Sequence, residues 1–302
     1  MELKKTPEGK ALLHIWRTGQ SYRRQKEKHY RAHWNNLYFS LLPQPPGEGD
    51  ILYYDIRRPF PFEDNSFDGI YAFHIIEHLT PVEAGVFALE LFRVLKPGGI
   101  CRISTPDLEE ITREYLKQLN ECWERPTEKN VVRYDWIKLE MLDQMVRDKN
   151  GGVMKETVEA GYFDPEYAKE RYGEVFREFV APPPEPGPSD KTRQGSAVVK
   201  KLTPSKLVRA VINRLRGLVY RYQLKKKEAM LGGDPRRTLE INKWTHDRLS
   251  LKLLLSEAGF TSFKKKTYAQ SDIPGWDRYQ LDTSDNGGHP IEPSLYVEVY
   301  KE

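Results

Sequence analysis

The residues best suited to chemistry lie in one short run, His74-Ile-Ile-Glu77-His78. The pattern H-x-x-E-H occurs in a class of zinc proteases, in which the two histidines share one helix face. Three features argue against zinc binding. The run follows a strand directly, Pro81 comes within three residues of His78, and no third ligand is assigned. A zinc helix should be long and regular through the motif, so we expect no metal. Histidine also suits proton transfer, because its unperturbed pKa lies near neutrality.

The elements around this run alternate between strands and a helix. We expect strands at residues 50–55, 67–73 and 100–104, with a helix between the last two. Thr80-Pro81 marks the start of that helix, as N-cap and first helical residue, and Gly98-Gly99 ends it. Strand, helix and strand within a few dozen residues form a βαβ unit, which implies a parallel sheet and an α/β fold.

Three sequence blocks resemble the class I S-adenosylmethionine-dependent methyltransferases, of the type 11-like group. The blocks run from Asp55 to Asp68, from His74 to Leu79, and from Leu91 to Gly99, where the chain reads Arg-Val-Leu-Lys-Pro-Gly-Gly. They occur in the family's order and at its spacing. The resemblance implies a Rossmann-like sheet with a helical insert and C-terminal antiparallel strands, and S-adenosylmethionine as the cofactor.

The resemblance also implies a cofactor site. In the family an acid at the end of the third strand bonds the adenine amine, which points to Asp55, with Ile56 beside it. Residues after the fourth strand face the methionine end of the cofactor, which points to Ala72, Phe73 and His74.

The acceptor side of the site follows from the same resemblance. The end of the fifth strand would face the substrate pocket, which makes Thr105 and Asp107 candidate substrate-binding residues. An acceptor hydroxyl must lose a proton, and His74, Glu77 and His78 are the candidate catalytic residues for that step. The alternative is that Glu77 and His78 only brace the turn into the next helix.

The N-terminal part departs from the family pattern. No acid followed by a glycine-rich loop is recognisable, and Gly47-Glu48-Gly49 enters a strand, which is the wrong context for such a loop. Three explanations stay open: a degenerate loop with Leu37–Leu42 as the first strand, a truncated or non-catalytic relative, or a partner chain that completes the sheet. An open central edge of the sheet would need a cover.

We expect four parts along the chain. Residues 1–49 form a basic helical segment, 50–107 the methyltransferase core, 108–235 a helical insert with a proline-rich linker at 181–198, and 236–302 the C-terminal part of the core. In that last part we expect a helix at 247–258 and strands at 261–268 and 294–300.

Composition narrows the class of protein. The 302 residues are 30% charged and 38% hydrophobic, as in a well-solvated globular chain, and no run is long and apolar enough to span a membrane. The only cysteines, Cys101 and Cys122, exclude a disulfide framework and a four-thiolate zinc site and favour a cytoplasmic setting. The first residues lack the apolar core of a secretory signal.

The net charge of +4 is small, but basic residues cluster at 4–31 and 200–227. A basic helix at 200–227 suits an anionic membrane face or an acidic glycan-lipid. The favoured interpretation is a solvated helix face, and nucleic-acid binding is not expected.

The predicted function is methyl transfer to an oxygen or nitrogen of a small or glycan-type acceptor. The insert, the basic helix and the C-terminal tail resemble a subgroup linked to polysaccharide biosynthesis. Trp244 and Trp276 could stack on a sugar, but an aromatic residue near a hairpin is more often part of the core. The alternative is a catalytically inactive methyltransferase-like scaffold or partner subunit, and a homo-oligomer is a further open possibility.

Overall fold

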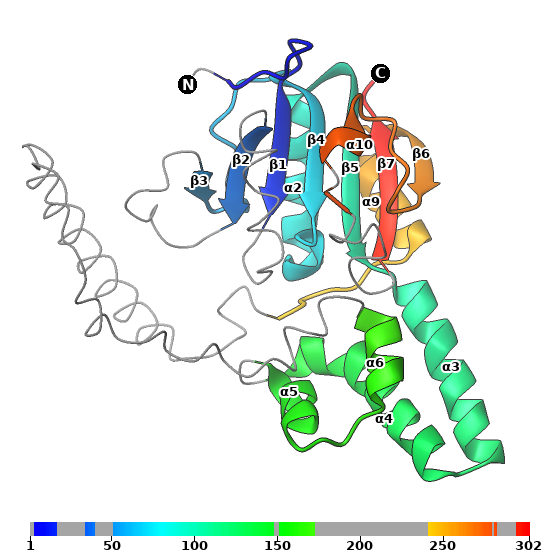
Figure 1. Ribbon diagram of the computed structural model, residues 1–302. Coiled ribbons are helices and arrows are strands. Elements are labelled where there is room, and N and C mark those ends of the chain that lie inside the picture. The colour runs from blue at the N-terminus through cyan, green and yellow to red at the C-terminus, as the bar shows by residue number, and fades with distance from the viewer. Residues whose placement is uncertain are drawn as a thin grey trace, which may run out of the picture.

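A computed structural model of the chain describes residues 3–16, 34–39, 51–147, 151–172, 241–279, 281–282 and 294–302. These residues build one seven-stranded sheet with helices on its faces and a helical extension at one end (Figure 1). The strands are β1 (Leu12–Trp16), β2 (Trp34–Phe39), β3 (Ile51–Tyr54), β4 (Phe67–Phe73), β5 (Leu95–Pro106), β6 (Thr261–Lys266) and β7 (Ser294–Tyr300). The helices are η1 (Ile76–His78, a 3-10 turn), α2 (Pro81–Val94), α3 (Leu108–Glu124), α4 (Glu128–Val146), α5 (Gly152–Glu159), α6 (Pro165–Tyr172), α9 (Arg248–Glu257) and α10 (Trp276–Tyr279).

The strand order is β3-β2-β1-β4-β5-β7-β6. The strands from β3 to β5 in this order pair in parallel, and β7 pairs antiparallel with both β5 and β6. The predicted Rossmann-like sheet with C-terminal antiparallel strands is therefore confirmed. In such a sheet, ligands bind at the carboxyl ends of the parallel strands, and that edge carries the residues discussed below.

The N-terminal expectation was wrong in its secondary structure. Residues 12–16 and 34–39 are strands and not helices, and β1 lies at the centre of the sheet, between β2 and β4. Leu37–Leu42 is not the first strand, because its first residues belong to β2. A central strand is buried on both faces, so apolar and polar residues do not alternate along it. The short run Leu12–Trp16 is also flanked by basic residues, which favoured the prediction of a solvated helix. With both strands supplied by this chain, neither truncation of the sheet nor a partner strand is needed to fill its centre.

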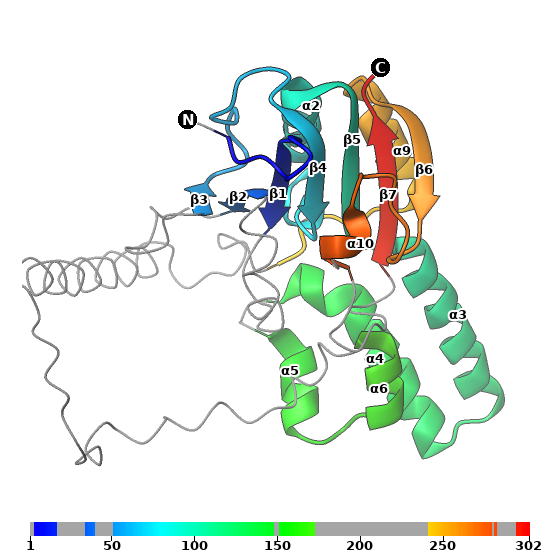
Figure 2. The same cartoon turned by 45° about the horizontal axis from the view of Figure 1, so that its top comes forward.

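One face of the sheet packs against α2 and α9 and forms the main core (Figure 2). The start of α2 is fixed by a capping box, in which the Thr80 side chain accepts from the Glu83 amide and the Glu83 carboxylate accepts from the Thr80 amide. Asp247 caps α9 in the same way, with Ser250 as its partner. These caps confirm the predicted helix starts near residues 80 and 247.

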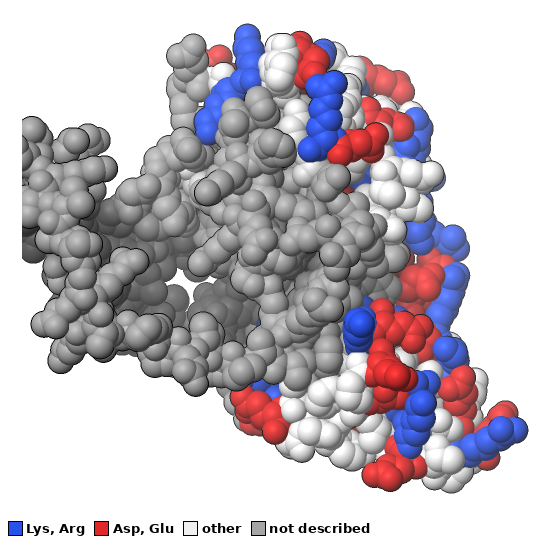
Figure 3. All heavy atoms as spheres, in the orientation of Figure 1, with Lys and Arg blue, Asp and Glu red and all other residues white. Residues whose placement is uncertain are grey.

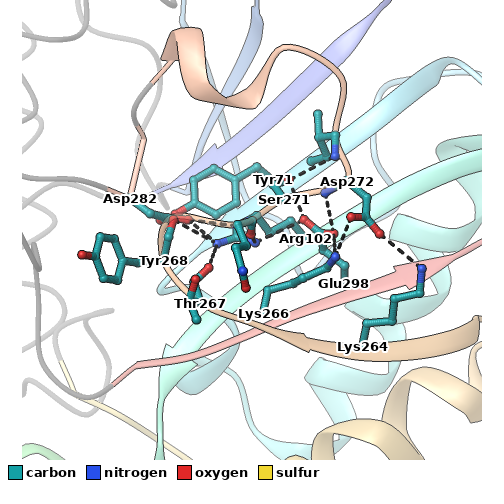
Figure 4. A network of polar contacts seen from close by, with 12 residues as sticks. Tyr71, Arg102, Lys264, Lys266, Thr267, Tyr268, Ser271, Asp272, Asp282 and Glu298 are labelled. Atoms are coloured by element: carbon teal, nitrogen blue, oxygen red, sulfur yellow. Dashed lines mark hydrogen bonds and ion pairs between the residues drawn. The ribbon is translucent and has the colours of Figure 1, made fainter. Parts of the chain in front are cut away.

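The other face of β4, β5 and β7 is covered by the segment that leads into and through α10. Arg102, on β5, is fully buried beneath this segment, with Asp282 and Glu298 as charged partners (Figure 4). Its Nε donates to Asp282 at 2.9 Å, and Nη1 donates to Glu298 at 3.1 Å and to the Gln270 carbonyl at 2.8 Å. The Asp282 carboxylate also accepts from the Tyr71 hydroxyl. The network ties the covering segment to three strands.

The helices α3 to α6 lie beyond the carboxyl ends of the parallel strands, as Figure 1 shows. This position fits the predicted helical insert after residue 107, and the bounds of the insert stay a prediction. The proline-rich linker at 181–198, the basic helix at 200–227, the basic residues 17–33 and Gly47–Gly49 lie outside the described residues.

No helix in the described part of the chain is long and apolar enough to cross a membrane. Acidic and basic side chains are interspersed over the described surface that Figure 3 shows.

Candidate active site

His74 occupies the turn that follows β4 in an unusual backbone conformation. Its φ is +44°, in the left-handed region, which residues other than glycine enter rarely and at some cost in energy. The His74 amide donates to the Ser104 carbonyl at 3.0 Å, which holds this turn against the neighbouring strand β5. Such strained positions cluster at functional sites, so the conformation supports a functional role for His74.

The His74 ring connects two polar side chains. Nδ1 lies 3.0 Å from Glu77 Oε1, and Nε2 lies 3.0 Å from Ser294 Oγ. Glu77 comes from η1, and Ser294 is the first residue of β7. The fold therefore places a hydroxyl, an imidazole and a carboxylate in one hydrogen-bonded row.

Glu77 is almost fully buried, and its neighbours keep it ionised. Burial raises the pKa of this carboxyl, but His74, His78 and a backbone hydrogen bond together outweigh burial, so the pKa lies below its usual value. The Thr105 hydroxyl donates to Glu77 Oε2 at 3.3 Å. Three of the residues singled out from the sequence, His74, Glu77 and Thr105, are thus brought together.

His78 and Asp107 have structural partners instead. The Nδ1 atom of His78 lies 3.1 Å from the Ile241 carbonyl oxygen, which matches the bracing alternative for this residue. Asp107 caps α3 by accepting from the amides of Glu109 and Glu110, and it forms an ion pair with Lys265. The run 76–78 is a single 3-10 turn, so it lacks the regular helix that the zinc-protease pattern requires.

Asp55 follows β3, three strand positions away from β4, or roughly 14 Å along the carboxyl edge. Its oxygens accept from Arg57 Nε and Nη2, each at 2.8 Å. Desolvation raises the pKa of Asp55, but the Arg57 hydrogen bonds and charge outweigh it and lower the pKa overall. Asp55 is thus a fixed anion. Ile56, Ala72 and Phe73 are all buried beside these strand ends.

The two tryptophans differ in their surroundings. Trp276 is buried in α10, where it packs edge-on against Tyr71. The guanidinium carbon of Arg102 lies 4.7 Å from the centre of the Trp276 ring. Trp276 is a core residue, which is the more common role expected of an aromatic near a hairpin, so it does not stack on a sugar. Trp244, by contrast, is 44% exposed.

Two residues of this region were missed from the sequence. Ser294 contacts His74 across 220 positions, and no local pattern signals such a pair. His246 is buried next to Asp107, with which it forms a β-bridge, and within the described part of the chain neither ring nitrogen has a hydrogen-bond partner. His246 is an isolated histidine before a helix, and the neighbouring residues form no pattern that predicts its burial.

The unpartnered ring of His246 predicts a loss of stability in acid. Burial lowers its pKa below 6.5, and the opposing charges of Glu77 and Asp247 do not restore it. Below pH 6.5 the unfolded chain therefore binds a proton that the folded chain resists, so the free energy of unfolding falls as the pH falls from about 7 to 5. Urea unfolding of wild type and His246→Leu at several pH values measures this, and the variant should show a shallower decline. Equal slopes in the two proteins would contradict the prediction.

A seven-stranded sheet of this order, with polar residues at the carboxyl ends of β3 and β4, defines a class I methyltransferase fold. Residues 42–103 match the family model described as a methyltransferase domain, which confirms the resemblance seen in the sequence.

Several of the proteins found by comparison are named as methyltransferases. Over 53 residues the chain is 55% identical to the sterol 24-C-methyltransferase erg6 of Schizosaccharomyces pombe, a match that covers 18% of this chain and 12% of that protein. A methyltransferase of Thermotoga maritima, described as a possible histamine N-methyltransferase, aligns with a TM-score of 0.37 and 13% identity over 97% of this chain and 83% of its own. One from Archaeoglobus fulgidus gives a TM-score of 0.38 and 10% identity over 97% and 86% of the two chains. The matched block thus spans only about an eighth of the sterol enzyme.

S-adenosylmethionine is the cofactor that the matched family implies, and the residues fit its adenine end. Asp55 Oδ1 accepts from both the amide and Nε of Arg57, whereas Oδ2 accepts from Nη2 and keeps a second lone pair, which can accept from an adenine amine. Ile56, the neighbour of Asp55, is fully buried in the main core, so Asp55 is the residue of this pair that can reach an adenine. Within the described strand β2 there is no carboxylate for the ribose hydroxyls, since residues 34–39 read Trp-Asn-Asn-Leu-Tyr-Phe.

Proposed function

We propose that the chain transfers a methyl group from S-adenosylmethionine to an oxygen or nitrogen of a small or glycan-type acceptor. The observation that carries this is the matched methyltransferase block, whose carboxyl strand ends hold Asp55 and the His74–Glu77 pair on one edge of the sheet. When bound, the cofactor supplies a methyl group already activated as a sulfonium. The chain must then hold the acceptor in line and take its proton.

His74 is the residue that we propose for the proton. Glu77 is ionised and can only accept hydrogen bonds, so it fixes the proton of a neutral His74 ring on Nδ1. Nε2 is then left with its lone pair, pointing at the Ser294 hydroxyl. An acceptor hydroxyl that replaces or contacts Ser294 Oγ would meet a base already in the correct tautomer.

The class of acceptor rests on two sources. The glycan-type acceptor and a role in polysaccharide biosynthesis come from the resemblance of the insert and tail, and the exposed Trp244 would offer an aromatic face to a sugar. The sterol enzymes share only the short matched block. A sterol, a neutral oligosaccharide, a phenol and a primary amine therefore form the first panel for transfer of a radiolabelled methyl group.

A catalytically silent scaffold is the second candidate. It is favoured by the sequence after β1, where residues 17–22 read Arg-Thr-Gly-Gln-Ser-Tyr and hold a single glycine, with no acid at the end of the strand. Titration of the purified protein with S-adenosylmethionine by calorimetry separates the two. Micromolar binding supports the enzyme, and no binding to the folded protein supports the scaffold.

Asp55→Ala is expected to weaken S-adenosylmethionine binding by about 10- to 150-fold, since it removes a hydrogen bond to a charged acceptor, and such a bond is worth about 1.5–3 kcal/mol. Glu63→Ala removes an exposed carboxylate from the same connector and serves as the control. Calorimetry on both variants gives the two dissociation constants. If Asp55→Ala binds as tightly as wild type, the adenine assignment is wrong.

A cytoplasmic location, and contact of residues 200–227 with a membrane surface, remain proposals from the sequence. Sedimentation with anionic and with neutral vesicles would test the second of these. Binding that depends on the anionic lipid would support a peripheral contact.

A further inference from the structure

We propose that Ser294, His74 and Glu77 form a nucleophilic triad, and that the chain carries an acyl-transfer activity toward small activated esters in addition to methyl transfer. The proposal rests on the arrangement of these three side chains and needs no methyl donor.

The geometry is that of a nucleophile, a base and an orienting carboxylate. Ser294 Oγ lies 3.0 Å from His74 Nε2, and His74 Nδ1 lies 3.0 Å from Glu77 Oε1. Both distances fall within the reach that proton transfer between a hydroxyl and an imidazole requires. The two ring nitrogens are used by different partners, so the row is continuous from hydroxyl to carboxylate.

The direction of the hydrogen bonds follows from the charge on Glu77. An ionised carboxylate cannot donate, so a neutral His74 must donate from Nδ1, and its Nε2 must accept. The hydrogen between His74 and Ser294 then belongs to the Ser294 hydroxyl. This is the arrangement in which the imidazole withdraws the hydroxyl proton as the oxygen attacks.

The surrounding structure holds the row in place. Thr105 donates to the second Glu77 oxygen, and the Glu77 carbonyl accepts from the amides of Lys243 and Trp244 at 2.7 and 3.1 Å. Ser294 is fixed at the end of β7 by its register opposite Pro106 of β5. Glu77 is 2% exposed, whereas the His74 side chain is 12% exposed and Ser294 is half-buried, so a small ester can reach the hydroxyl but not the carboxylate.

The reaction would proceed in two balanced steps. Ser294 Oγ forms a bond to the ester carbonyl carbon while His74 Nε2 takes the hydroxyl proton, and the alkoxide leaves with that proton as an alcohol. Water then attacks the acyl-serine, again giving up a proton to His74, and the acid and the free Ser294 hydroxyl are released. No electron donor or acceptor takes part.

A fluorophosphonate and p-nitrophenyl acetate are the probes that test this on the full-length chain. We expect the fluorophosphonate to label the wild type at Ser294, with loss of fluoride, as peptide mass spectrometry would show. Ser294→Ala should lose the label, and His74→Asn should slow labelling by at least about 100-fold, because a general base contributes at least that factor. Asparagine tolerates the left-handed φ of position 74, which keeps the turn intact.

Ser256→Ala is the matched control, since Ser256 is an exposed serine of α9 outside the site. It should be labelled and should hydrolyse p-nitrophenyl acetate like the wild type, and circular dichroism should show that all three variants are folded. No labelling of the folded wild type, or labelling that persists in Ser294→Ala, would overturn the proposal. Calorimetry with S-adenosylmethionine on the same samples reports on the methyltransferase separately, so failure of one activity is distinguishable from failure of the other.

Discussion

Replacement of Arg102 by methionine is expected to lower the free energy of unfolding by about 3–5 kcal/mol, because it takes a buried guanidinium away from two buried carboxylates, Asp282 and Glu298. Arg102, Asp282 and Glu298 all have fully buried side chains, so water cannot replace the lost contacts. Asp282 keeps the hydrogen bond from the Tyr71 hydroxyl. Glu298 keeps the hydrogen bond from Ser271 and a longer contact of 3.7 Å with Lys266, so the guanidinium is the closer of its two cations. Since a domain is stable by only about 5–15 kcal/mol, this change should be visible as a large shift in a urea unfolding curve followed by tryptophan fluorescence.

Two comparisons isolate the cause. Arg113→Met removes an arginine of α3 that is 61% exposed and pairs with Glu109 and Glu110, and it should cost no more than about 1 kcal/mol. Combining Arg102→Met with Asp282→Leu and Glu298→Met should recover most of the loss, because an apolar group can replace a buried ion pair without a net penalty. A loss below about 1 kcal/mol for Arg102→Met alone would mean that the network does not secure the covering segment.

The sequence predicts those elements whose residues interact locally. The alternating apolar pattern of residues 294–300 and the capping signal at Thr80-Pro81 each depend on neighbouring residues, and both elements were found where expected. Strand β1 was missed because burial on both faces removes the alternation by which a strand is recognised, and the surrounding basic residues favoured a helix.

The same distinction applies to the site. His74 and Glu77 are three residues apart, and their pairing could be inferred from spacing. Ser294 reaches His74 only because the antiparallel strand β7 inserts between β5 and β6, which brings its first residue to the carboxyl end of β5. The ion pair between Arg102 and Glu298 depends on the same strand. Long-range pairings of this kind need the topology, which local patterns do not contain.

His74→Asn is expected to lower methyl transfer by about 10²- to 10⁴-fold, since this is the range that a positioned general base contributes. Asparagine accepts the left-handed backbone of position 74 and can still donate to Glu77, so the change removes mainly the Nε2 lone pair. Transfer of radiolabelled methyl groups to the best acceptor of the panel gives the rate, and calorimetry gives the affinity for S-adenosylmethionine, which should change by less than about threefold. Ser262→Asn, at another left-handed position, is the control for the backbone and should leave the rate unchanged.

The two measurements together decide what His74 does. A lower rate with intact cofactor affinity assigns it to proton removal, because the base acts on the acceptor and not on the bound sulfonium. A parallel loss of affinity would instead place His74 at the methionine end of the cofactor, the other role that the family resemblance gives it. Glu77→Gln should then follow His74→Asn in direction but with a smaller loss, since the amide can still accept from Nδ1 while it no longer stabilises the charged imidazolium that forms as the proton is taken. A rate that His74→Asn leaves unchanged would contradict the base assignment, and the proton would have to leave through another group at the carboxyl edge of the sheet.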